Sequence, residues 1–351
     1  MGNGVVGVIR NGARNLAPSY FALVMATGIV SIAAGLMGMP RVSRGLFGIN
    51  IFFYGVLWIL TLIRVFRDFP RVAADLTSHE RGHGFLTLVA GTCVLGRQFH
   101  LIAGDIGTAS VLWLVGLALW GLILYTFIAA VTVRETKPGL ESGLSGGWLL
   151  LVVSTQSITV TGAGIARSFG PAAEVVLFLS LSLFLLGFLL YLLVICLIFY
   201  RFTFFRFSPQ ELSPPYWINM GAMAITTLAG SVLILEADHW RIVAEIMPFL
   251  KGITLLFWAT ATWWIPLLII LGVWRHGFKK FPLRYDPSYW GLVFPLGMYM
   301  VCTVQLARVT GLDFLRVLPR VFVFLALAAW CLAAFGLVRR LAGLFRGKPG
   351  V

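Results

Sequence analysis

Residues 79–83 have a spacing that is typical of zinc chemistry. The segment His79-Glu80-Arg81-Gly82-His83 is a literal H-E-x-x-H motif. In metalloproteases this motif is helical, so that both histidines bind zinc from one face while the glutamate acts as general base. Here a glycine lies inside the motif, the preceding residues resemble a loop, and no strong third ligand is evident. We therefore favour a polar entry to a membrane segment, and we expect no catalytic residue, metal or cofactor.

A second kind of chemistry is indicated by polar side chains within otherwise apolar segments. Residues 146–164 contain Gln156 and several serines and threonines, and segments 18–37, 84–99, 216–235 and 288–307 show a weaker form of the pattern. Hydroxyl and amide groups can bind an anion through donors alone. Because the middles of these segments contain no Asp or Glu, nothing there would attract a cation. The pattern favours an anion pathway, although Gly and Thr also mark close packing between membrane helices.

Candidate pathway residues are those that are polar, small or bend-forming within these segments. They are Thr27, Gly28, Gly91, Thr92, Gln156, Asn219, Gly221, Thr226, Pro295 and Gly297. Two basic residues near the outer segment ends, Arg97 and Arg308, would draw anions into a mouth or would instead snorkel at the interface. One sequence does not fix the rotation of each helix, so several of these residues are equally compatible with helix packing.

Composition identifies the class of protein that must position these residues. The chain of 351 residues is 59% apolar and only 11% charged, with a mean hydropathy of +0.93. That leaves too little polar surface for a soluble protein. Spans of about 20 apolar residues cross a bilayer as helices, and we expect ten of them, near residues 18–37, 47–66, 84–99, 108–133, 146–164, 172–200, 216–235, 247–274, 288–307 and 318–338.

The odd-numbered spans repeat a common opening. Each begins with an aromatic residue, and these lie 63 to 73 residues apart, at Phe21, Phe85, Trp148, Trp217 and Trp290. A period near two crossings indicates repeated helical hairpins. Since the even spans are more uniformly apolar, we expect odd helices inside and even helices outside. No long polar insert interrupts the chain, so residues 1–351 are expected to form one transmembrane domain with short tails at 1–17 and 340–351.

The distribution of charge predicts the orientation of the chain. The formal net charge is +14, but the basic residues flank the spans and form no nucleic-acid-binding motif. With the N-terminus inside, 18 of the 27 Lys and Arg residues lie on the cytoplasmic side. We therefore expect a multi-pass protein of the cell inner or plasma membrane, with both termini cytoplasmic. Its expected partners are the lipid bilayer and small anions, and no nucleic acid.

Three segments resemble the tellurite-resistance/C4-dicarboxylate transporter family, which includes the plant slow anion channel and yeast malate and sulfite transporters. They run from Pro18 to Ser31, from Pro214 to Ala222 and from Tyr289 to Pro295, and Gly84 to Gly96 is similar to the malate and sulfite branch. The resemblance implies ten helices as five hairpins in a quasi-fivefold arrangement around a central pore, often as a homotrimer. It also implies that a phenylalanine of the ninth helix, here Phe294, closes the pore.

The resemblance and the polar spans together predict transport of small anions, with C4-dicarboxylates such as malate as the leading substrate. Sulfite or inorganic-anion efflux is the main alternative, and the motifs do not decide between them. The absence of a titratable group in the odd-span middles slightly favours channel-like passage over a proton-coupled carrier. A membrane zinc metalloprotease using residues 79–83 is the remote alternative, and a structural or sensory membrane protein is a third.

Overall fold

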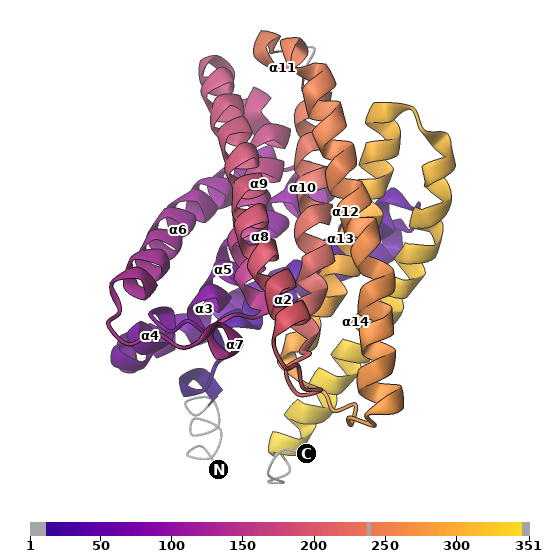
Figure 1. Cartoon of the computed structure of the whole chain (residues 1–351). Coiled ribbons are helices and arrows are strands. Elements are labelled where there is room, and N and C mark those ends of the chain that lie inside the picture. The colour runs from indigo at the N-terminus through magenta and orange to yellow at the C-terminus, as the bar shows by residue number, and fades with distance from the viewer. Residues whose placement is uncertain (1–11, 237–239, 346–351) are drawn as a thin grey trace.

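The computed structural model describes residues 12–236 and 240–345, and these residues form helices and turns without any strand. The helices, labelled as in Figure 1, are α2 (Ala22–Leu36), α3 (Pro40–Arg67), α4 (Phe69–Leu76), α5 (Leu86–Gln98), α6 (Ile106–Val133), α7 (Leu140–Gly143), α8 (Leu150–Ile165), α9 (Ala173–Phe204), α10 (Ile218–Leu235), α11 (Arg241–Glu245), α12 (Met247–Val273), α13 (Trp290–Thr310) and α14 (Val317–Phe345). The expected all-α membrane fold is confirmed.

Nine helical runs of the described residues are long and apolar enough to cross a membrane. One of them, Gly146–Phe204, has 59 residues, which is about twice the length that a bilayer needs. It bends at Gly170, whose φ of 54° and ψ of −119° are not helical and suit a residue without a Cβ. The bend separates α8 from α9, so this run supplies two of the predicted spans.

Burial divides the long helices into two groups. In the runs that contain α2, α5, α10 and α13, between 72% and 94% of the most apolar window is buried. In the runs that contain α3, α6, α12 and α14, the buried share of that window is only 17% to 28%. α8 belongs to the first group, because all but one of its residues are buried. Contacts join α2 to α5, α5 to α8, α8 to α10, α10 to α13 and α13 back to α2, so these five inner helices form a closed ring.

The outer helices α3, α6, α9, α12 and α14 each pack on the inner ring and expose large apolar side chains on the opposite side. Exposed Phe, Leu, Ile and Val residues on such long helices are suited to lipid contact. The described chain begins and ends at the same end of the bundle (Figure 1). α14 continues to Phe345, so the tail that we expected from residue 340 is helical over its first residues.

Each inner helix begins with a short 3-10 turn at its amino end. These turns are η1 (Pro18–Phe21), η2 (Gly82–Phe85), η4 (Gly146–Leu149), η6 (Pro214–Trp217) and η9 (Pro287–Tyr289). They contain or directly precede the aromatic residues whose spacing indicated a repeat. The turns also contact one another in a closed ring, from η1 through η2, η4, η6 and η9 back to η1. The amino ends of all five inner helices therefore meet at one end of the bundle.

Two buried arginines tie the loops at this end to the bundle. Arg64 of α3 donates to the Leu16 carbonyl over 2.9 Å and pairs with Asp75 of α4. Arg201 of α9 pairs with Glu211 over 3.0 Å and also donates to a tyrosine hydroxyl. Because an unpaired buried charge is costly, these partners hold the connecting segments in place.

Candidate functional site

The carboxyl-terminal halves of all five inner helices enclose a cavity. Its empty space is about 460 Å³, counted with the open solvent at its mouth. The lining side chains come from α2 (Ile29, Ile32, Leu36), α5 and the turn after it (Val94, Arg97, Leu101), α8 (Ser157, Val160, Thr161), α10 (Ile225, Leu228) and α13 (Met298, Val301, Gln305). The cavity therefore lies on the axis of the inner ring, and its wall is mostly apolar.

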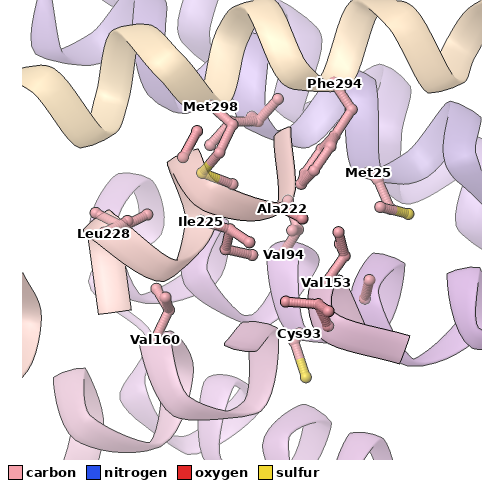
Figure 2. Packing of buried hydrophobic residues seen from close by; sticks show 14 of the residues in the cluster. Met25, Cys93, Val94, Val153, Val160, Ala222, Ile225, Leu228, Phe294 and Met298 are labelled. Carbon is pink, nitrogen blue, oxygen red and sulfur yellow. The ribbon is translucent and has the colours of Figure 1, made fainter. Parts of the chain in front are cut away.

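A layer of buried side chains lies about one helical turn from this cavity, toward the amino ends of the inner helices. Phe294 lies one helical turn before the cavity-lining Met298, and therefore on the same face of α13. Met25 and Val153 precede cavity-lining residues of α2 and α8 by the same spacing. Figure 2 shows the Phe294 side chain pointing from α13 toward Ala222 of α10. All four side chains are at most 2% exposed, so they are packed inside the bundle at this level.

Pro295 fixes α13 against its neighbour in the ring at this level. A Cβ built on Gly221 of α10 would lie 2.7 Å from the Pro295 ring, so only glycine allows this approach. On the other side, a Cβ on Gly297 would lie 2.9 Å from Ile29 of α2. Gly221, Pro295 and Gly297 thus allow close packing beside Phe294, which positions its helix, and none of them lines the cavity.

The hydroxyls of α2 and α5 that we expected on the pathway point toward outer helices. Thr27 accepts a hydrogen bond from Trp330 Nε1 of α14 at 3.0 Å. Thr92 lies 3.1 Å from the Tyr54 hydroxyl of α3 and donates to a carbonyl of its own helix. Neither residue lines the cavity. These contacts have a physical reason, because polar groups of the outer helices, which face apolar surroundings, require buried partners.

The same outward direction is found on α8. Gln156 donates to the Phe184 carbonyl of α9 at 3.0 Å, and the neighbouring Thr155 accepts from Trp120 of α6 at 2.9 Å. Polarity alone therefore did not identify the axial face of this helix. Its cavity-lining hydroxyls are Ser157 and Thr161, which lie on the other side.

The remaining small and polar candidates also lie at helix contacts. A Cβ built on Gly91 would lie 3.4 Å from the Phe21 carbonyl oxygen and 3.4 Å from the Val24 side chain of α2. A Cβ built on Gly28 would lie 2.5 Å from Val94 of α5. Thr226 donates to a carbonyl of its own helix, and it does not line the cavity. Asn219 is fully buried and does not line the cavity, and neither its Oδ1 nor its Nδ2 has a hydrogen-bond partner among the described residues.

The two arginines predicted at the mouth differ in position. Arg97 lines the cavity from α5, whereas Arg308 is exposed near the end of α13 and does not line it. Arg97 is the charged residue among the described cavity-lining side chains. Helical phase thus directs Arg97 to the axis, while the exposed position of Arg308 also suits the snorkelling alternative.

The H-E-x-x-H segment does not have the geometry that zinc binding requires. It forms a turn that continues into the 3-10 turn η2, so the two histidines do not share an α-helical face. His83 is buried against Phe127 and Trp148, with ring centroids 6.5 and 6.4 Å away. Within the described residues, no group of three His, Cys, Asp or Glu side chains is placed to bind a metal.

The sequence did not identify the apolar cavity wall. Ile29, Val94, Val160, Ile225 and Met298 are ordinary core residues by type. The sequence offered one indication of this wall: Met298 follows Phe294 by four residues, so the two side chains lie on the same face of the helix. That signal becomes useful only when the axial face of α13 is known.

The fold and the cavity define a multi-pass α-helical membrane protein built around a ring of five helices. Residues 15–338 match the model of the SLAC1 family, described as voltage-dependent anion channel. The match covers nearly the whole chain, so this protein belongs to the SLAC1 family, a family of membrane anion transport proteins.

Relatives with transport names also match along most of the chain. An uncharacterized transporter of Methanocaldococcus jannaschii is 29% identical over 297 residues, which cover 82% of each chain. The malic acid transport protein of Schizosaccharomyces pombe is 21% identical over 350 residues, covering 92% of this chain and 77% of the relative. An uncharacterized membrane protein of Mycobacterium tuberculosis is 35% identical over 161 residues, or 46% of this chain and 81% of the relative. These names are of transporters and membrane proteins, not enzymes.

Proposed function

We propose that this protein passes small anions along the axis of its five inner helices and that Phe294 closes this pathway. The observation that carries the proposal is the cavity enclosed by all five inner helices, with the layer containing Phe294 about one helical turn from it. A bulky apolar ring in a narrow passage blocks ions through its size and through dewetting of the passage. C4-dicarboxylates such as malate are the proposed substrates, which the malic acid transport relative supports.

The electrostatics of the inner ring favour anions over cations. The amino ends of five helices meet on one side, and each carries about half a positive charge from its aligned peptide dipoles. None of these five described helices has an Asp or Glu in its first turn, although Asp286 caps the short turn that leads into α13 and offsets part of the charge there. An anion therefore meets a favourable potential at this end.

We further propose one transmembrane domain, a homotrimeric assembly, and an inner or plasma membrane location with both termini cytoplasmic. The location of most Lys and Arg residues near the amino ends of the inner helices supports this orientation. The trimer is proposed from the family resemblance.

Flux into liposomes tests the function. Purified protein reconstituted without added metal should pass malate, and chloride and sulfite measured in parallel define the selectivity. Folded protein that passes none of these anions would refute the proposal. A preference for sulfite over malate would instead select the alternative substrate.

A further inference from the structure

The mouth of the cavity carries the wrong partial charge for an anion. The five inner helices all direct their carboxyl ends to the cavity side, and each end carries about half a negative charge. An anion in the cavity therefore needs a compensating positive group. Arg97 is the charged side chain that the described cavity wall provides.

The hydroxyls of the cavity wall cannot supply the missing donors. Ser157 donates to the Val153 carbonyl at 2.7 Å, and Thr161 lies within 3.1 Å of the carbonyls of Ser157 and Cys93. Each hydroxyl has a single proton, so these two present oxygen lone pairs, not protons, to a ligand. An anion in the cavity must therefore be bound by the nitrogen groups of Arg97 and Gln305.

The guanidinium of Arg97 has unused capacity. One N–H, on Nη1, donates to His100 Nδ1 over 3.0 Å. Glu236 is near enough to interact electrostatically with Arg97, but it forms its ion pair with Arg167, and Arg97 makes no direct ion pair with a carboxylate of the described residues. A guanidinium has five N–H donors, which leaves enough for a bidentate contact to a carboxylate. Gln305 also lines the cavity, and its Oε1 is buried without a partner in the described structure; exchanging the amide O and N would turn its N–H donors toward a ligand.

A glycine on the facing helix makes room for this side chain. A Cβ built on Gly164 of α8 would overlap Arg97 Nη1. The guanidinium thus lies across the cavity wall from α5 to α8, in a place that any larger residue would fill. An arginine that merely snorkelled to the membrane surface would not need this space.

We infer that Arg97 and Gln305 form a carboxylate-binding site in the cavity wall, between Phe294 and the carboxyl ends of the inner helices. Gly164 leaves the space that the Arg97 side chain occupies. The site deepens the proposed function, on which it rests, and it takes one carboxylate group of an organic acid such as malate. The two parallel N–H donors of the guanidinium match the two oxygens of a carboxylate, whereas chloride requires only the positive charge of the guanidinium.

Binding of sodium malate to the full-length purified protein, measured by calorimetry, tests the site apart from transport. Arg97→Gln should raise the Kd for malate about tenfold to a hundredfold, because the loss of a hydrogen bond to a charged group changes an equilibrium constant by about that factor. Arg97→Lys should weaken malate binding but preserve chloride competition. Gly164→Ala should weaken malate binding although the charge is unchanged. Lys251→Gln is the matched control, because Lys251 is exposed on α12 near the same end of the bundle.

Unchanged malate affinity in Arg97→Gln would overturn the site, and so would the absence of malate binding to wild-type protein. An equal loss in Lys251→Gln would also overturn it, because the effect would then be one of general charge. If the wild-type protein binds malate through Arg97 but passes no malate in liposomes, the result would instead count against the proposed transport function alone. Size-exclusion profiles and thermal unfolding of each variant confirm that it is folded.

Discussion

Replacing Phe294 by alanine should increase anion flux about 10-fold to 100-fold. The ring is 1% exposed and must leave its position for an anion to pass the closed layer. Full burial of a phenylalanine side chain is worth about 1.5–3 kcal/mol. Each 1.4 kcal/mol corresponds to a factor of ten, so the open arrangement is populated at about one part in ten to one in a hundred. Removing the ring removes this penalty.

The substitution should also destabilise the protein, but less than a buried Phe→Ala change usually does. Such changes cost about 3–5 kcal/mol when an empty cavity remains. Here the new space adjoins the solvent-accessible cavity, so water can enter and the cost should approach the transfer value of about 1.5–3 kcal/mol. Thermal unfolding in detergent measures this difference.

Phe184→Ala is the matched control. Phe184 of α9 is equally buried, but it packs against Phe257 of α12, with ring centroids 5.7 Å apart, and near Gly230 of α10. It lies between helices and away from the cavity, so its removal should lower stability without raising malate flux in liposomes. Equal flux increases in both variants would show a general leak, and an unchanged flux in Phe294→Ala would refute the gating argument.

Two further predictions concern residues outside the pathway. The pKa of Glu211 is held below its ordinary value of 4.5, first by the backbone N–H of Ser208 and also by nearby groups. Its contribution to stability is therefore present above pH 4.5 and is lost as the pH falls through the lower folded value. The melting temperature should drop on acidification, and less so in Glu211→Gln; identical pH profiles would contradict this. Trp330→Phe removes the hydrogen bond to Thr27 and should cost about 1 kcal/mol of stability with malate flux unchanged. A marked change in flux would return Thr27 to the pathway.

The fold was predictable because it depends on pattern and length. Apolar runs of membrane-spanning length gave the helices, and the spacing of residues such as Phe85 and Trp148 gave the five repeated openings, which the structure shows as 3-10 turns in a closed ring. The even helices were recognisable as outer helices because their spans are more uniformly apolar than the odd ones. Only the break between α8 and α9 depends on a single residue, Gly170.

The lining of the site was less predictable because it depends on the rotation of each helix. A rotation of about 100° per residue separates Gln156, which faces α9, from Ser157, which lines the cavity. Both are polar, and both lie on the same helix. Residue type therefore could not distinguish them, and the choice of polar residues as pathway candidates selected those that satisfy outer-helix partners. Arg97, which the sequence suggested as a mouth residue, does line the cavity, because a charge has few stable positions in a membrane protein.

The outward direction of these polar groups also explains how an apolar axis can serve an anion. Indole N–H groups on the outer helices need partners away from lipid, and inner-helix hydroxyls such as Thr303, which accepts from Trp258 at 3.0 Å, supply them. Inner-helix hydroxyls therefore bond to outer helices or to carbonyls. The cavity wall on the axis is mostly apolar, and the protons of its two hydroxyls, Ser157 and Thr161, are already donated to carbonyls. In the proposed pathway, attraction comes from the helix amino ends on one side and from Arg97 on the other. Between them the wall binds an anion weakly, and weak binding is what allows an ion to leave as readily as it enters.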